Sequence, residues 1–129
     1  PKNNFLRVAE VLIEQGEMEK AIKALDTYQK NYPHHKVNYD MYMLPYAEAY
    51  YKAGAIEKGN AVVEILYDYY VDELNYINSL SPEYKKLLIQ DQQTALGVLQ
   101  RMGQSTRQYK QMDLSTKIDS TFKEEINFY

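Results

Sequence analysis

The stretch FLRVAEVLIEQGEMEKAIKALDTYQKNYP, residues 5–33, decides the fold of this chain of 129 residues. Its apolar and small residues recur at steps of three and four on both sides of Gly16, which is the period of an α-helix. Glycine readily takes the left-handed conformation that ends a helix, and proline stops one. The stretch therefore predicts helices over about 4–15, capped by Asn3 or Asn4, and over about 18–31. The pattern consists of Phe5, Val8, Ala9, Leu12, Gly16, Ala21, Leu25 and Pro33.

A looser copy of the same pattern follows, with Gly54 placed 38 residues after Gly16. It predicts helices over about 41–53 and 56–78. Pro45 lies in the opening turns of the first of these, so that helix is expected either to begin irregularly or to start near Leu44. No proline ends the following helix where the first copy has Pro33, which makes that helix unusually long. The copy consists of Met43, Tyr46, Ala47, Tyr50, Gly54, Gly59 and Val63.

The remainder of the chain also has helical periodicity. Ser81-Pro82 is a typical helix start, with serine as the cap and proline at the first helical position. That helix is expected to run to about Met102 and to be broken by Gly103, and 104–127 is expected to form a sixth helix with a possible break near Asp113. Strand signals are absent. We therefore expect an all-α fold, with about six helices in three hairpins over about 4–32, 41–78 and 82–127, forming a single helical-repeat domain.

Composition narrows the classes of function. Apolar residues make up 45% and charged residues 26%, which is typical of a folded globular chain. The formal charge of −3 gives no general attraction to nucleic acid, so no nucleic-acid partner is expected. No run reaches the roughly 18 to 20 apolar residues that cross a bilayer, so we expect no membrane insertion by this chain. Because the chain begins with Pro1 rather than Met, it is expected to be a piece of a longer protein.

Residues that could carry catalysis or hold a metal are few. There is no cysteine, and the adjacent His34 and His35 lack the helical spacing with which two histidines share one metal ion. The carboxylate pairs at four-residue spacing, 10 with 14 and 68 with 72, are typical of a solvated helix face. No phosphate-binding loop and no serine elbow is present. We therefore predict no catalytic, cofactor-binding or metal-binding residues in this chain.

The two hairpins resemble tetratricopeptide repeats, which stack as a right-handed array of helix pairs. In that family the first helix of each hairpin lines a concave groove that binds a protein or peptide. Members that bind chaperones hold a terminal carboxylate with Lys and Asn, but Leu6 and Glu10 stand at those places here, so the resemblance does not imply that activity. The mixed acidic and apolar groove favours a basic or apolar partner segment. The groove positions implied by the register of the two glycines are Leu6, Glu10, Ile13, Glu14, Leu44, Glu48, Tyr51 and Lys52.

Tyrosine is unusually frequent, with 14 residues against 3 Phe and no Trp. Tyrosine combines apolar area with a hydroxyl that needs a partner or water. One interpretation is that the tyrosines line helix–helix interfaces whose edges stay wet. The other is a tyrosine-lined groove for a ligand or partner.

The whole chain also resembles a narrower group, the C-terminal soluble region of large, multi-spanning, mannosyltransferase-like bacterial membrane proteins. This resemblance implies a domain on the exported, periplasmic side of a membrane, tethered to a glycosyltransferase whose reactive residues lie outside this chain. The leading hypothesis is a protein-binding accessory module. The alternatives are an integral part of the transferase that contacts acceptor or sugar, and a structural cap without a ligand. The runs that carry the resemblance are RVAE at 7–10, LPYAEAYYK at 44–52, EKGN at 57–60, LNY at 74–76 and ALGVLQR at 95–101.

Overall fold

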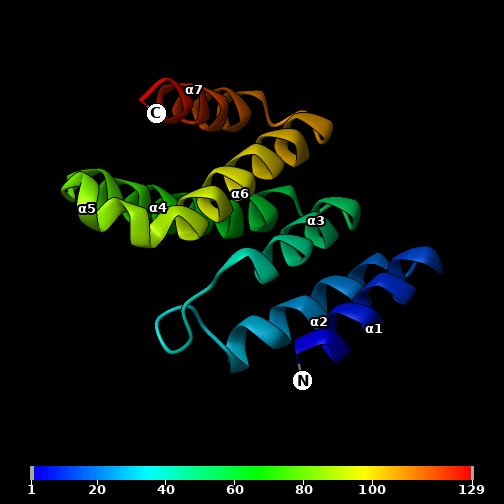
Figure 1. The fold of residues 1–129 in the computed structure, drawn as a ribbon. Coiled ribbons are helices and arrows are strands. Elements are labelled where there is room, and N and C mark those ends of the chain that lie inside the picture. The colour runs from blue at the N-terminus through cyan, green and yellow to red at the C-terminus, as the bar shows by residue number, and fades with distance from the viewer. Residues whose placement is uncertain (1, 129) are drawn as a thin grey trace. The chain divides into compact units, whose positions relative to one another are not determined.

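A computed structural model describes the backbone of residues 2–128 and the side chains of residues 4–127. Within that part of the chain all regular elements are helical and none is a strand (Figure 1). The predicted all-α class is therefore confirmed. The α-helices are α1 (Lys2–Glu14), α2 (Met18–Asn31), α3 (Leu44–Lys52), α4 (Ile56–Ser79), α5 (Pro82–Lys85), α6 (Ile89–Gln108) and α7 (Met112–Phe128), and 3-10 turns form η1 (Met41–Met43) and η2 (Lys86–Leu88).

The helices form two compact units, Pro1–Glu64 and Ile65–Tyr129. Unit 1 holds α1, α2, η1, α3 and the first part of α4, and unit 2 holds the rest of α4 with α5, η2, α6 and α7. The grouping into one domain of three hairpins stays a prediction. None of the described helices is long and apolar enough to cross a membrane.

The turns after α1, α3 and α6 have the same hydrogen bonds. After α1, the amide of Gly16 donates to the carbonyl of Ile13 (3.0 Å) and the amide of Glu17 donates to that of Leu12 (2.8 Å). This pair of bonds is the Schellman motif, which satisfies carbonyls at a helix end. Gly54 forms the same motif after α3, and both glycines have positive φ, 78° for Gly16 and 87° for Gly54. The predicted turns at the two glycines are confirmed.

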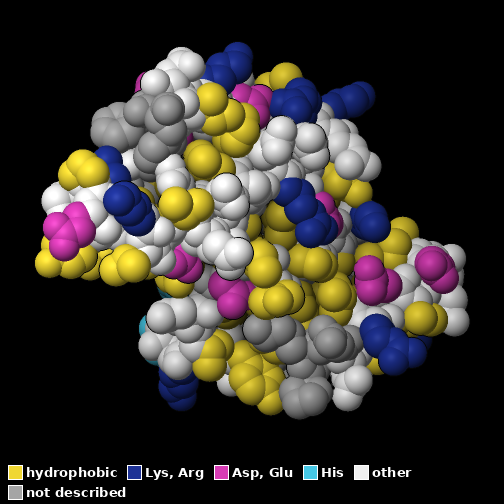
Figure 2. Space-filling model, viewed as in Figure 1, with side chains coloured by type: hydrophobic (Ala, Val, Ile, Leu, Met, Phe, Trp, Pro, Cys, Tyr) yellow, Lys and Arg dark blue, Asp and Glu magenta, His cyan; other side chains and the backbone are white. Residues whose placement is uncertain are grey.

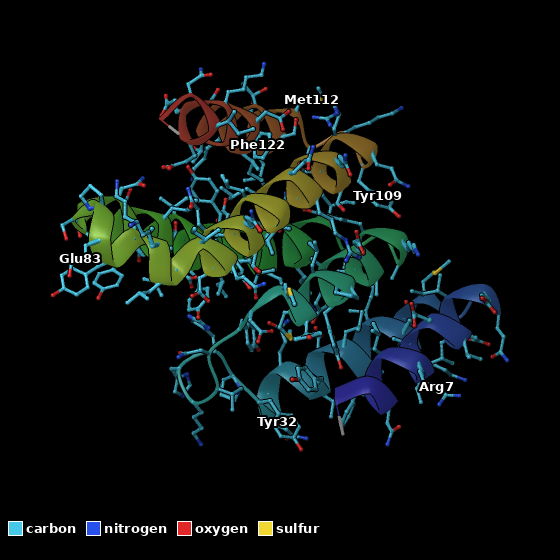
Figure 3. All side chains as sticks on the ribbon, in the orientation of Figure 1. Arg7, Tyr32, Glu83, Tyr109, Met112 and Phe122 are labelled. Atoms are coloured by element: carbon cyan, nitrogen blue, oxygen red, sulfur yellow. The ribbon has the colours of Figure 1, made fainter. Side chains whose placement is uncertain are left out.

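The third Schellman turn has a lysine at the left-handed position. Lys110 has φ 63°, its amide donates to the carbonyl of Arg107 (3.0 Å), and the amide of Gln111 donates to that of Thr106 (2.8 Å). Figure 3 labels Tyr109 and Met112 on either side of this turn. The α6–α7 hairpin therefore turns where the sequence has no glycine.

Gly103 does not end a helix, and this prediction was wrong. The residue is buried within α6, which continues to Gln108, and Asp113 lies in the first turn of α7. A Cβ on Gly103 would meet the carboxylate of Asp119 and, at 3.6 Å, the side chain of Ile118, both on α7. Glycine is therefore present because α6 and α7 approach closely there, not because the backbone needs a break.

Two predicted helix starts also differ from the structure. Because α1 begins at Lys2, Asn3 and Asn4 lie inside its first turn and do not precede it as a cap. The predicted fifth helix does begin at Pro82, but η2 interrupts it before α6. Ser81 occupies the cap position with extended backbone, and its side chain makes no capping hydrogen bond. The third predicted helix, α3, starts at Leu44, as one of the two predicted alternatives had it, and the irregular turn η1 precedes it.

Stacked tyrosines form the centre of unit 1. The ring of Tyr28 on α2 lies 4.5 Å from that of Tyr46 on α3 and 5.8 Å from that of Phe5 on α1, between ring centroids. Aromatic pairs at these separations stabilise beyond the apolar area that they bury. The small residues Ala9 and Ala21, which are fully buried, let α1 and α2 approach.

In unit 2, α7 packs against α6 and against the second part of α4. The hydroxyls of Tyr67 on α4 and Thr121 on α7 lie 2.6 Å apart, and the amide of Asn78 donates to Glu125 (2.9 Å). Arg107 on α6 forms an ion pair with Asp119 on α7. The apolar core of this unit includes Leu66, Tyr70, Leu74, Ile77, Ala95, Leu99, Met102 and Ile118.

Candidate functional site

The eight predicted groove residues differ in how far they reach the surface. On α1, Glu10 and Glu14 are exposed, whereas Leu6 and Ile13 are half-buried. On α3, Lys52 is exposed and Glu48 is half-buried. The remaining two, Leu44 and Tyr51, are 1% and 3% exposed and present almost no surface to a partner.

Tyr46 of α3 contacts the part of α1 that carries two of the predicted groove positions. This fully buried tyrosine of α3 forms a hydrogen bond with the backbone of Leu6 and lies near the carboxylate of Glu10. Burial raises the pKa of Tyr46 well above its usual value, and the neighbouring Tyr28 and Glu10 raise it further. The predicted α1 positions 6 and 10 therefore do lie beside α3.

Tyr51 points into the α3–α4 contact rather than into a groove. A Cβ on Gly59 of α4 would meet the Tyr51 ring at 2.6 Å, and the Tyr51 hydroxyl donates to the side-chain oxygen of Asn60 (2.6 Å). The charged residues that reach the surface at the predicted positions are thus three acids and one lysine, Glu10, Glu14, Glu48 and Lys52. This surface has an excess of negative charge.

A polar network that sequence reasoning missed joins α2, α3 and α4. The fully buried Tyr50 donates its hydroxyl proton to Asp26 (2.8 Å) and accepts a hydrogen bond from Gln29 (2.7 Å). The other oxygen of Asp26 lies 2.7 Å from the ammonium of Lys58. Because its members come from three helices, no spacing in the sequence indicates this cluster. Its hydrogen bonds and ion pair connect α2 of the first hairpin to α3 and α4 of the second.

Histidines and buried polar groups give no sign of a ligand. The ring of His34 accepts a hydrogen bond from the amide of Tyr39 (2.9 Å), which places it within the loop between α2 and η1. In the described part of the chain, no buried side-chain nitrogen or oxygen lacks a hydrogen-bond partner. No group of three or more His, Cys, Asp or Glu among those residues is arranged to hold a metal ion.

Glu73 is a carboxylate whose surroundings raise its pKa. Glu73 lies half-buried on α4. Burial is the larger cause of its raised pKa, and the nearby charge of Asp91 on α6 is the smaller one. It belongs to neither of the carboxylate pairs that the sequence indicated. A perturbed acid marks a functional site only together with a cavity and further groups, and neither described depression includes Glu73.

Two open depressions lie along α1, away from the predicted groove residues. One has a volume of about 420 Å³ and is lined by Asn4, Arg7, Val8, Val11 and Leu12. The other, of about 280 Å³, lies between α1 and α2 and is lined by Asn4, Phe5, Val8, Ala24 and Thr27. Neither of these two described depressions includes any of the eight predicted positions.

Five tyrosines of unit 1 have a raised pKa, with burial as the largest cause for each. For Tyr39 the pKa is about 12. A tyrosine in the unfolded chain ionises near pH 10, so its raised native pKa contributes stability that is complete below about pH 10 and is lost as the pH rises through the native value. The five are Tyr28, Tyr39, Tyr46, Tyr50 and Tyr51.

We therefore expect the free energy of unfolding to fall as the pH rises above about 10. Urea denaturation at intervals between about pH 8 and pH 11 measures it, and absorbance at about 295 nm counts tyrosinates in native and urea-unfolded chain. The native chain should hold fewer tyrosinates than the unfolded chain at about pH 11. Equal counts while the far-ultraviolet spectrum remains native would contradict burial of these rings.

No family model matches this chain, and no curated protein or solved structure matches it either. The resemblances to tetratricopeptide repeats and to the mannosyltransferase-like proteins therefore stay predictions. What is known of the site comes from the residues themselves, an acidic surface on α1 and α3 next to tightly packed tyrosines.

Proposed function

We propose that this chain is a non-catalytic helical-repeat module that binds a protein or peptide partner through the exposed face of α1 and α3. The observation that carries the proposal is the repeated hairpin. The α1–α2 and α3–α4 pairs turn at Gly16 and Gly54 with the same hydrogen bonds; the first helix of one pair carries the exposed Glu10 and Glu14, and that of the other carries the half-buried Glu48. Stacked hairpins of this kind typically provide an extended surface for another chain.

The proposal includes the finer architecture and the context. The hairpins stack in the right-handed manner of tetratricopeptide repeats, and the module is an accessory domain of a membrane-bound, glycosyltransferase-like protein on the exported side of a bacterial membrane. Support for the first part is the matching register of the two turns, with fully buried Ala9 and Ala21 where the first helix pair approaches. Support for the second part is the resemblance of sequence runs across the chain.

The charge of the surface predicts the kind of partner. Because the charges here are the exposed Glu10 and Glu14 and the half-buried Glu48 against the exposed Lys52, a segment that combines basic and apolar residues fits better than an acidic one. The probes are two synthetic peptides that differ in charge alone, one alternating Lys with Leu and one alternating Glu with Leu. The full chain should bind the basic peptide at least about tenfold more tightly than the acidic one, measured by fluorescence anisotropy.

The double substitution Glu10→Lys with Glu48→Lys should weaken binding of the basic peptide by about tenfold, since each reversal replaces an attraction with a repulsion. Glu124→Lys is the matched control, because Glu124 is an exposed acid of α7 and the change alters the net charge in the same direction. The control should keep the wild-type affinity. Unchanged binding by the double variant, or an equal loss in the control, would rule out the groove.

A further inference from the structure

A second surface of α1 carries an apolar stripe that no described helix covers. Val8 and Val11 are 52% and 50% exposed and form its apolar part, and the polar Asn4 and Gln15 continue the same line of positions at its two ends. Gln15 continues the helix, since its amide donates to the carbonyl of Val11 (3.0 Å). The steps between these residues are four, three and four, which is the spacing of the contact positions in a two-stranded coiled coil.

The shape of the surface suits the ridge of another helix. The depressions of about 420 and 280 Å³ lie along this stripe, both include Asn4 and Val8, and the smaller one extends to Ala24 and Thr27 on α2. Helices pack when the side-chain ridge of one enters the groove beside the ridge of the other. A helix with protruding valines and flanking depressions therefore offers both parts that such a contact needs.

Two opposite charges flank the stripe on one side. Arg7 and Glu14 are both exposed and are seven residues apart, so they lie on the same face two turns from each other. Neither has an ion-pair partner among the side chains of residues 4–127. Figure 3 shows the labelled Arg7 side chain pointing away from α2. These are the flanking positions whose charges set orientation in paired helices.

We propose that this stripe is a homodimer interface in which α1 packs antiparallel against α1 of a second copy about a twofold axis. Val8 then lies against Val11 of the second copy, and Val11 against Val8. Side chains lean toward the N-terminus of their own helix, so Arg7 and Glu14 of opposite chains lean toward each other and meet. The twofold axis repeats this ion pair on the other side of the contact.

The size of the contact sets its expected strength. The 13 residues of α1 span about 20 Å at 1.5 Å per residue, so the interface is at the small end of specific protein contacts. Small interfaces belong to transient complexes, and we expect a dissociation constant in the micromolar range or weaker. The dimer should accordingly depend on concentration.

Sedimentation velocity of the full chain between about 1 and 500 µM tests the proposal. The weight-average mass should rise from 15.2 kDa toward twice that value. Arg7→Glu should weaken the dimer by at least about tenfold, because both ion pairs become like-charge contacts. Arg7→Glu combined with Glu14→Arg should restore the affinity to within about threefold, because the pairs are then reversed. Lys123→Glu, an exposed position on α7, is the matched control and should leave the mass unchanged.

A chain that stays at 15.2 kDa throughout this range overturns the proposal and leaves the stripe to a different partner. Association that Arg7→Glu does not weaken also overturns it. The competing surface consists of Tyr84 on α5 and Leu87 on η2, which are 55% and 77% exposed. Hydrophobic side chains are exposed at the left of Figure 2, where Figure 1 places α5. Loss of the dimer with Leu87→Ser but not with Arg7→Glu would assign the contact to that patch. Glu14 belongs to both surfaces, but Arg7→Glu and Leu87→Ser leave Glu10, Glu14 and Glu48 unchanged, so failure here leaves the groove proposal standing.

Discussion

Replacing Tyr46 by alanine is expected to lower the free energy of unfolding by about 3 to 5 kcal/mol, the range for deleting a large aromatic ring from a core. The side chain is fully buried, and its ring stacks on Tyr28 at 4.5 Å. Its hydroxyl also forms a hydrogen bond with the backbone of Leu6 on α1. The substitution therefore removes contacts of α3 with both helices of the first hairpin, and urea denaturation followed by far-ultraviolet circular dichroism measures the loss.

Tyr42→Ala is the matched control for this change. Tyr42 precedes Tyr46 by four residues but is 63% exposed, so its loss should change stability by no more than about 0.5 kcal/mol. Similar losses for the two variants would mean that the tyrosine stack does not hold the first unit together.

Gly59→Ala is expected to destabilise the chain by about 1 to 3 kcal/mol, although alanine is the better helix former. The added Cβ would lie 2.6 Å from the Tyr51 ring and 3.0 Å from the carbonyl oxygen of Ala47. The ring has little freedom to move, because it is 3% exposed and its hydroxyl is bonded to Asn60. Urea midpoints at equal denaturant slope measure the effect.

The opposite result is expected for Gly97→Ala, which makes the same chemical change in α6. No atom lies within 4 Å of a Cβ at Gly97, so only the helix preference of alanine acts, with a gain of about 0.5 to 1 kcal/mol. A gain at both positions would show that α3 and α4 are not in close contact at Gly59.

The helix pattern could be predicted from sequence wherever periodicity and glycine agreed. The boundaries of α2, 18–31, match the prediction, and Gly16 and Gly54 turn the chain as expected. The predicted helix end at Gly103 was wrong. Gly103 lies where α6 and α7 pack closely, and the turn between these helices is made by Lys110, which is not a glycine. A sequence shows which residue favours a left-handed backbone, but not where a neighbouring helix needs room.

For the candidate site, the sequence indicates which side chains of one helix are exposed but not which of them another helix covers. Three of the predicted groove residues, Glu10, Glu14 and Lys52, are exposed, and exposure on one helix follows from its period. That they line a groove stays a prediction. The period does not show that Leu44 and Tyr51 are covered, since that depends on residues such as Gly59 in another helix. The bonds of Tyr50 to Asp26 and Gln29 span more than 20 residues and leave no periodic signal.

The long helix α4 has a practical consequence for anyone dissecting this chain. Its 24 residues cross the boundary between Glu64 and Ile65 without interruption. A cut at that boundary would create two new helix ends, each with unsatisfied amides or carbonyls. Ending a fragment at Ser79 instead would keep the helix whole but leave the apolar side chains of Leu66, Leu74 and Ile77 without their covering helices. Separate expression of either half should therefore produce aggregation-prone material, and fusion partners or protease sites belong at the turns that follow α1, α3 and α6.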